Sequence, residues 1–259
     1  MKDRNIQQEI TQRVEFIRKV LSEARAEGIV FGNSGGKDSA LVGILCKMAC
    51  ENTLGVIMPC ESKRNYSQDR EDAEVLARMF NIETRIVELT QTKKALVEAV
   101  GVATGITSSA SANIAPRLRM ATLYAIAASE NRIVAGTGNR SERNMGYFTK
   151  WGDGAYDFNP IADLTVTEVY EFLRYLDTPQ EIIDKAPSAG LFDGQTDEAE
   201  MGITYETIDK YLLGLKIEEH KQQIIDSYHR RSIHKREKPP VFEQSVDVTG
   251  YSKPNKPPK

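Results

Sequence analysis

A glycine-rich turn follows the first short apolar run of the chain, in the segment Ile29–Ala40, IVFGNSGGKDSA. Its two adjacent glycines leave backbone N–H groups unobstructed, and an apolar helical pattern follows. Backbone N–H groups at such a strand–loop–helix junction bind phosphate. The loop does not fit the Walker A pattern, because Phe31 stands where that pattern needs glycine and Asp38 follows Lys37. The segment therefore predicts a phosphate site of another kind.

Two carboxylates accompany the predicted phosphate loop. Asp38 would repel phosphates unless Mg²⁺ lay between them. Glu142 ends the segment GTGNRSE at residues 136–142, which follows another apolar run. Taken singly, Asp38 could be a helix N-cap and Glu142 a solvated turn residue. Mg²⁺ commonly takes one or two carboxylates plus substrate phosphates, so the pair predicts a magnesium site if the two loops meet.

A third polar segment, at residues 146–157, reads GYFTKWGDGAYD. It could be a glycine-rich hairpin with aromatic packing. It could also be a binding loop, in which Lys150 meets an anionic substrate and Asp153 and Asp157 accept hydrogen bonds. These residues are candidates for substrate binding.

The apolar periodicity predicts strands that alternate with helices, which is typical of an α/β fold with a doubly wound parallel sheet flanked by helices. In such sheets ligands bind beyond the carboxyl ends of the strands. The loops at Ser34–Ser39 and Gly136–Arg143 both belong to that edge. The predicted strands are 29–31, 54–58, 84–89 and 131–135, and the predicted helices are 3–27, 39–51, 67–80, 91–100, 111–129, 165–176, 204–213 and 217–231.

Composition excludes several function classes. The chain has 259 residues and a net charge of −3, so nothing indicates nucleic acid as a partner. No apolar stretch is long enough to span a membrane. Three cysteines do not form a disulfide framework and are expected to be buried, reduced thiols, which favours the cytoplasm.

The loop SGGKDS resembles the pyrophosphate loop of the ATP-pyrophosphatase superfamily, whose fold is adenine nucleotide alpha hydrolase-like. The segments GNSGGKDS, NIAPRLRM, GTGNRSE, YFTKWGDGAYDFNP, KAPSAGL and DEAEMGITYETIDKYL follow in that order. Together they resemble ammonia-dependent NAD synthetase. The resemblance implies that deamido-NAD is adenylated by ATP and then amidated by ammonia, giving NAD, AMP and pyrophosphate. Mg²⁺ is the implied cofactor.

The resemblance also implies roles for individual residues. Asp153 is implied in the ammonia pocket, where it could attract NH₄⁺ and accept its proton. Lys37 is a second catalytic candidate, although relatives often carry an uncharged residue there. The ATP site would comprise Gly32, Asn33, Ser34, Gly35, Gly36, Lys37, Asp38, Ser39, Thr137 and Ser188; the deamido-NAD site Arg117, Lys150, Asp157, His234 and Lys235; and the metal site Asp38 and Glu142.

Two positions depart from the family pattern. Relatives commonly carry lysine, which reaches the ATP phosphates, where this chain has Val166. They usually lack a proline where Pro116 stands, beside Arg117. Pro116 removes a backbone donor, so we expect it to kink or restart its helix.

Other readings of the site remain open. A GMP synthetase-like or tRNA-thiolating member of the superfamily would share the loop, but the latter needs a basic face or cysteines placed for sulfur transfer. A non-catalytic nucleotide-binding module, like the universal stress proteins, would not need Glu142. ATP binding without AMP formation would identify such a module.

Residues 1–235 are expected to form one catalytic domain with a helical C-terminal region, and residues 236–259 a Lys- and Pro-rich segment. The polar segment 191–203 is the lid candidate, although it could be a plain solvent loop. No room remains for a glutaminase domain, so free ammonia is the expected nitrogen source unless a separate amidotransferase delivers it. The resemblance implies a homodimer, for which the N-terminal helix and the alanine-rich helix at 121–128 are candidate interfaces; both patterns also fit core packing.

Overall fold

The computed structural model describes residues 4–61, 67–185 and 197–242. These residues form a parallel sheet of four strands, β1 (Gly28–Gly32), β2 (Thr53–Ile57), β3 (Glu83–Ile86) and β4 (Arg132–Ala135). The strand order is β3-β2-β1-β4, so β1 lies between β2 and β4. The order of the chain reverses beside β1, which opens a crevice for ligands at the carboxyl edge. The predicted α/β fold and its four strands are confirmed.

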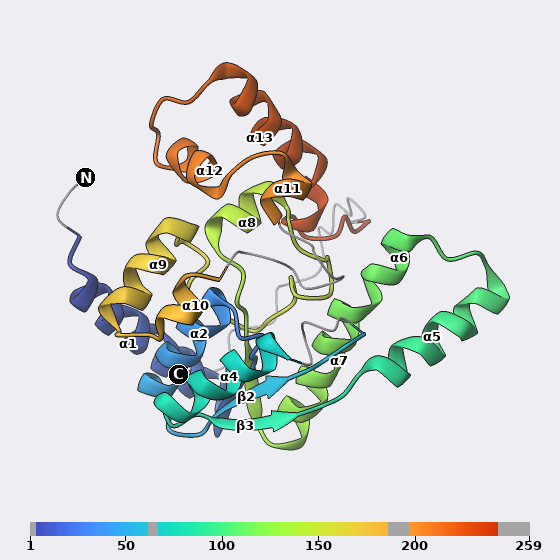
Figure 1. Ribbon diagram of the computed structural model, residues 1–259. Helices are drawn as coiled ribbons and strands as arrows, with labels where there is room; N and C mark the ends of the chain where they lie inside the picture. The colour runs from blue at the N-terminus through green and yellow to red at the C-terminus, as the bar shows by residue number, and fades with distance from the viewer. Residues whose placement is uncertain (1–3, 62–66, 186–196, 243–259) are drawn as a thin grey trace, which may run out of the picture.

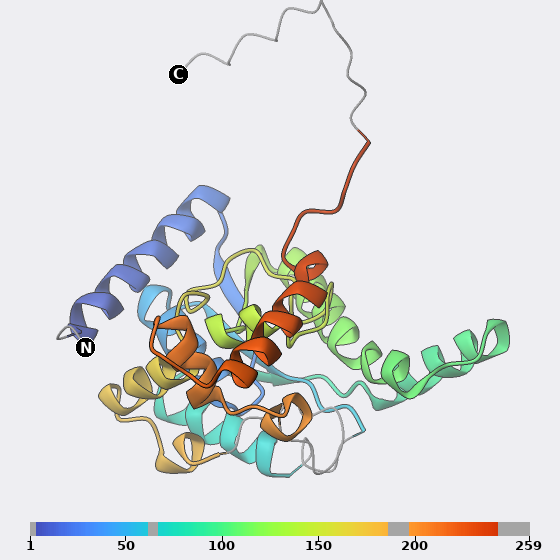
Figure 2. The ribbon, with the colours of Figure 1, turned by 90° about the horizontal axis from the view of Figure 1, so that it is seen from above.

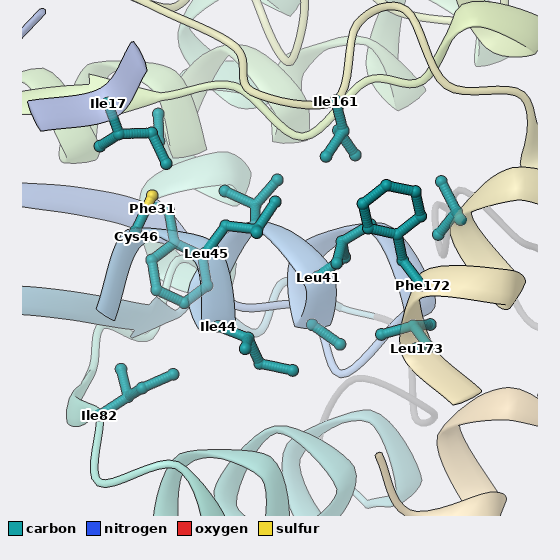
Figure 3. Packing of buried hydrophobic residues seen from close by; sticks show 14 of the residues in the cluster. Ile17, Phe31, Leu41, Ile44, Leu45, Cys46, Ile82, Ile161, Phe172 and Leu173 are labelled. Atoms are coloured by element: carbon teal, nitrogen blue, oxygen red, sulfur yellow. The ribbon is translucent and has the colours of Figure 1, made fainter. Parts of the chain in front are cut away.

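Helices cover both faces of the sheet (Figure 1). Side chains alternate along β1, so that Ile29 and Phe31 enter one apolar layer and Val30 the other. The first layer includes α1 (Ile6–Ala24), α2 (Lys37–Ala49), α4 (Gln68–Met79), α9 (Val166–Tyr175) and α10 (Gln180–Ile183). Figure 3 shows Leu41 and Leu45 of α2 in this layer together with Phe31 and Phe172. The second layer is built on α7 (Ile114–Ser129).

The chain leaves the compact body between β3 and α7. There α5 (Thr90–Ala103) and α6 (Ser108–Ala112) form an arm that extends away from the sheet (Figures 1 and 2). Along α5 only Lys93 is buried, and Leu96, Val100 and Val102 are exposed.

The segment predicted as one helix at 111–129 is divided between two helices, α6 and α7. Pro116 stands in the first turn of α7, where a missing N–H is tolerated, so the proline restarts the helix and does not kink it.

A third apolar cluster joins the C-terminal helices to α8 (Arg140–Met145). It includes α11 (Asp197–Met201), α12 (Tyr205–Leu212) and α13 (Glu219–Arg231), and the short 3₁₀ helix η1 (Ile233–Lys235) follows. The helices predicted at 204–213 and 217–231 are confirmed. No helix among the described residues combines the length and apolar character that a membrane span requires.

Candidate functional site

Two loops that lie far apart in the sequence meet at the carboxyl edge of the sheet. Asn139 Nδ2, after β4, donates a hydrogen bond of 3.0 Å to Asp38 Oδ1, which follows β1 and lies 101 residues away. A cavity of about 640 Å³ opens beside them. Of the predicted site residues, those that line it are Gly32, Asn33, Ser34, Gly36, Lys37, Asp38, Ser39, Thr137, Glu142, Asp153 and Lys235.

The loop after β1 is held in one shape by its own groups. Gly35 has φ +69°, and a Cβ there would lie 2.2 Å from the carbonyl oxygen of Asp69, so only glycine fits. Ser34 Oγ accepts from the Gly36 N–H at 3.3 Å and lies 3.1 Å from Ser39 Oγ. Amides and hydroxyls are therefore gathered at the cavity before any ligand binds.

Helix α2 begins directly after the loop. Its first residue is Lys37 and its N-cap is Gly36. Asp38 thus lies within the first turn, and the N-cap interpretation of Asp38 is wrong. Lys37 Nζ lies 2.7 Å from Asp38 Oδ2 and 5.6 Å from the ring centre of Tyr205. Burial disfavours the charged form of Lys37, but Asp38 and Glu142 more than offset this, and the pKa of Lys37 lies above its ordinary value.

Glu142 is positioned by a reciprocal cap at the start of α8. Asn139 Oδ1 accepts from the Glu142 N–H at 2.9 Å, and Glu142 Oε2 accepts from the Asn139 N–H at 3.1 Å. Burial and the nearby charge of Asp38 raise the pKa of Glu142 well above its ordinary value. Two crowded carboxylates at a phosphate-binding edge fit a divalent cation, which would relieve their repulsion.

The described residues hold no cluster of three or more His, Cys, Asp or Glu side chains suited to a metal. Two carboxylates, Asp38 and Glu142, could hold Mg²⁺ if phosphate oxygens or water completed its coordination, as is usual for this ion. A third carboxylate lies near. Asp197, which lines the cavity, accepts from Tyr205 Oη at 3.0 Å. The sequence did not single out Asp197, because it lies in a polar segment with the composition of a loop.

Asp153 lines the same cavity. The Thr149 N–H donates to its Oδ1 at 2.9 Å, which fixes the carboxylate. The residue as a whole is solvent-exposed, but protein atoms surround its carboxylate, and this desolvation raises the pKa of Asp153. Lys235 and Arg119 are close enough to oppose the shift.

Lys235 and Arg119 supply positive charges near Asp153. Lys235 Nζ donates to the carbonyls of Gly146 and Phe148 at 2.7 and 2.6 Å, and burial lowers the pKa of Lys235. Arg119 Nε donates to the Met58 carbonyl at 3.2 Å. Arg119 lines the cavity but was not predicted from the sequence. The predicted residue, Arg117, lies two residues earlier on the same helix, and that spacing turns its side chain to another face.

Besides Gly35 of the loop, four described residues among the predictions lie outside the set that lines the cavity. Three of them meet: Arg117 Nη2 donates to the Lys150 carbonyl at 3.3 Å, and Lys150 Nζ to the His234 carbonyl at 2.5 Å. These three form a cluster outside the cavity lining, which we call the rim cluster. Asp157 lies apart, since its Oδ2 accepts from the Val134 N–H at 2.7 Å. Tyr124 Oη donates to the other oxygen at 3.1 Å, and burial together with Asp157 raises the pKa of Tyr124 to about 12.

The remaining predicted positions are Ser188, the lid candidate, Val166 and the three cysteines. Ser188 and residues 191–196 of the lid candidate lie outside the described residues, whereas Asp197–Met201 of that candidate forms α11. Val166 begins α9 and is 4% exposed within the third apolar cluster, so it leaves no gap where a missing charge would stand. The cysteines are free thiols, as predicted: Cys46 and Cys60 are buried and Cys50 partly so.

Known proteins of similar sequence and structure were compared with the chain. The family described as NAD synthase matches residues 9–239. The NH(3)-dependent NAD(+) synthetase of Carboxydothermus hydrogenoformans is 48% identical over 240 residues, 92% of this chain and 98% of that protein. The NMN synthetase structure from Francisella tularensis has a TM-score of 0.87 at 39% identity and covers 93% of this chain and 100% of that one. The NH3-dependent NAD synthetase of Campylobacter jejuni has a TM-score of 0.75 at 31% identity, with 93% and 100% covered.

Proposed function

The chain belongs to the NAD synthase family, and we propose how its residues carry out the ATP-dependent amidation of deamido-NAD with ammonia. One observation carries the assignment. Asp38 of the pyrophosphate loop and Glu142 of α8 line one cavity, which Asp153 also lines. The cavity thus combines a place for phosphates with a separate anionic group for an incoming nitrogen.

The first half-reaction activates the substrate acid. A carboxylate is a poor acyl electrophile, because its charge repels nucleophiles and oxide is a poor leaving group. Its attack on the α-phosphate of ATP makes AMP the leaving group and releases pyrophosphate. The amides and hydroxyls of Ser34–Ser39 stabilise the charge that develops on pyrophosphate. Asp38 and Glu142 would hold Mg²⁺, which would neutralise phosphate charge. The positive charge of Lys37 compensates the negative charge of Asp38, with which it is paired.

The second half-reaction delivers nitrogen. Ammonium dominates in neutral water, but only NH₃ can attack the adenylate. Asp153 lines the cavity and is held by the Thr149 N–H. Its charge attracts NH₄⁺, and a carboxylate with a raised pKa is better suited to accept the proton than an ordinary one. Asp153 is therefore the proposed ammonia site.

The other assignments follow from position. Thr137 and Ser188 would bind ATP beside the loop. Lys235 would face the substrate from the cavity wall. The rim cluster and Asp157 lie outside that wall, and they would hold parts of deamido-NAD that extend beyond the reacting carboxylate.

The experiment is a product assay. The chain is incubated with ATP, Mg²⁺, ammonium and deamido-NAD, and AMP and NAD are quantified. Asp38→Asn and Glu142→Gln are each expected to lower turnover by about 100-fold or more, the scale of losing a preorganised electrostatic group. Both variants should keep the fold by circular dichroism. Near-normal turnover in both would refute the metal assignment.

A second substrate deserves the same assay. The similarity to an NMN synthetase, at 39% identity over 93% of this chain, makes the corresponding mononucleotide acid a second candidate. Both acids present the same nicotinate carboxylate, so the cavity alone does not separate them. The rim cluster would separate the two substrates, because a mononucleotide is shorter than a dinucleotide and would not extend to the rim cluster. Substitution of Lys150 by Met should raise KM for deamido-NAD more than for the mononucleotide if the dinucleotide is the true substrate.

We also propose that residues 1–235 act as one catalytic unit in a cytoplasmic homodimer. Helix α1 is a poorer candidate for the dimer interface, because its apolar residues Ile10, Val14 and Ile17 are buried in the core of the same chain. The arm of α5 and α6 offers the better surface, since Leu96, Val100 and Val102 are exposed there. Light scattering of the purified chain tests the dimer.

A further inference from the structure

Lys185 joins three separate parts of the site, and no motif in the sequence assigned it a role. It follows α10, and its side chain is 10% exposed. Its ammonium lies 3.1 Å from the carbonyl oxygen of Gly35, 2.8 Å from Asp69 Oδ1 and 2.6 Å from Asp72 Oδ2. An ammonium has three N–H donors, and three acceptors surround this one.

The contact with Gly35 bears on the direction of one peptide group. The described residues contain no cis peptide. In a trans peptide the C=O and the following N–H point in opposite directions. By holding the Gly35 carbonyl on the side of α4, Lys185 turns the Gly36 N–H to the other side, toward Ser34 Oγ. Both Ser34 and Gly36 line the cavity.

The contact with α4 bears on charge. Asp69 and Asp72 are 14% and 7% exposed, and both pair with the same ammonium. Asp69 also lines the cavity. Without the lysine, two crowded carboxylates would stand beside the loop that receives pyrophosphate, and they would repel each other and the anion.

We propose that Lys185 is a positioning residue for the pyrophosphate leaving group. It orients the Gly35–Gly36 peptide so that the Gly36 N–H holds Ser34 Oγ at the cavity, and its single positive charge offsets part of the negative charge of Asp69 and Asp72. The inference rests on the proposed function, because it assigns pyrophosphate to this loop. Lys185 acts through the loop and need not touch the anion itself.

The test measures binding of magnesium pyrophosphate to the full chain by calorimetry, followed by steady-state kinetics for each substrate. Lys185→Met removes the charge and the donors, and Lys185→Arg restores both. Lys93→Met is a matched control, because Lys93 is 6% exposed and pairs with Glu61 at 2.6 Å but does not line the cavity. Should Lys185→Met fail to fold, Lys185→Gln, which keeps an N–H donor, is measured in the same way.

Lys185→Met is expected to weaken pyrophosphate binding about tenfold or more and to raise KM for ATP similarly, the scale of losing hydrogen bonds to a charged group. KM for deamido-NAD should change by less than about twofold, because Lys185 is proposed to act only on the phosphate loop. An equal rise of KM for every substrate would instead indicate general damage to the protein. Lys185→Arg should recover most of the loss, and Lys93→Met should bind like the parent.

Unchanged pyrophosphate binding in Lys185→Met would overturn the proposal, as would an equal loss in Lys93→Met or a parallel rise of every KM. The proposed function is decided separately, by whether the parent forms AMP and NAD. Pyrophosphate binding is measured without turnover, so the two failures are distinguishable.

Discussion

Replacing Asp153 by Asn removes one charge from the cavity and almost nothing else. The amide oxygen can still accept the Thr149 N–H, which now reaches Asp153 Oδ1 at 2.9 Å. What is lost is the attraction for NH₄⁺ and the proton acceptor. Two unit charges about 4 Å apart interact by about 4 kcal/mol at an effective dielectric of about 20, and desolvation removes part of this. A net loss of about 1.4 to 2.7 kcal/mol corresponds to a rise of about 10- to 100-fold in KM for ammonium.

The assay varies ammonium at fixed pH with ATP and deamido-NAD in excess. KM for ATP and for deamido-NAD should stay within about threefold of the parent, since uniform binding losses affect every substrate. Glu206→Gln is the charge-matched control, because Glu206 is 75% exposed and pairs only with Lys210 among the described residues. If Asp153→Asn changed only the ATP requirement, the ammonia site would be misassigned.

The same variant has a consequence for stability. Burial raises the folded-state pKa of Asp153 above its unfolded value, so the folded state binds more protons between the two. The contribution of this group to the free energy of unfolding is therefore lost as pH rises from the unfolded pKa through the folded one. Asp153→Asn should flatten that slope and unfold no more easily than the parent at neutral pH. Thermal unfolding at several pH values measures it, and a steeper slope in the variant would contradict the assigned cause.

Three further outcomes are expected. Gly35→Ala should lower the free energy of unfolding by about 1 to 3 kcal/mol and the melting temperature by several degrees, because a Cβ would lie 2.2 Å from the Asp69 carbonyl oxygen at φ +69°; an unchanged melt would show that the loop relaxes. Asp209→Ala should lower the free energy of unfolding by about 3 kcal/mol or more, because Ser141 Oγ and Thr167 Oγ1, which donate to Asp209 at 2.5 and 2.7 Å, would lose their acceptor. Denaturant titration measures this loss. Removal of Mg²⁺ with EDTA should weaken ATP binding by about tenfold or more, because two carboxylates then face the phosphates unscreened; equal affinity by calorimetry would exclude the metal site.

The sheet and the core were predictable because they depend on periodicity. Apolar runs of strand length alternate with helical patterns, and this fixes a parallel order that places the carboxyl ends of the strands together. Pro116 shows the limit of the method. A proline in an apolar helical run indicates a break, but only the position of Asn113 between α6 and α7 shows that the break is a new helix start.

The site was predictable where it depends on loops adjacent to strands and unpredictable where it depends on helix faces. Asp38 and Glu142 follow β1 and β4 directly, so topology alone brings them together. Arg119 reaches the cavity from α7, where a shift of one or two residues decides whether a side chain enters it, and Lys185 reaches it from the segment that follows α10. Arg119 and Lys185 were therefore not predicted as site residues, whereas Asp38 and Glu142, in the loops after the strands, were predicted and line the cavity.

The charges of the cavity explain why the loop differs from a Walker A loop. Asp38, Glu142 and Asp197 all line the cavity, and Lys37 is already paired with Asp38 at 2.7 Å. Lys37 therefore offers little uncompensated positive charge to a triphosphate. The donors that remain are the neutral amides and hydroxyls of the loop, whose direction depends on the backbone. Under the proposed function, a cation brought with the nucleotide would offset the phosphate charge at the α–β bond, and the acidic pair Asp38 and Glu142, which would repel bare phosphate, would receive that cation.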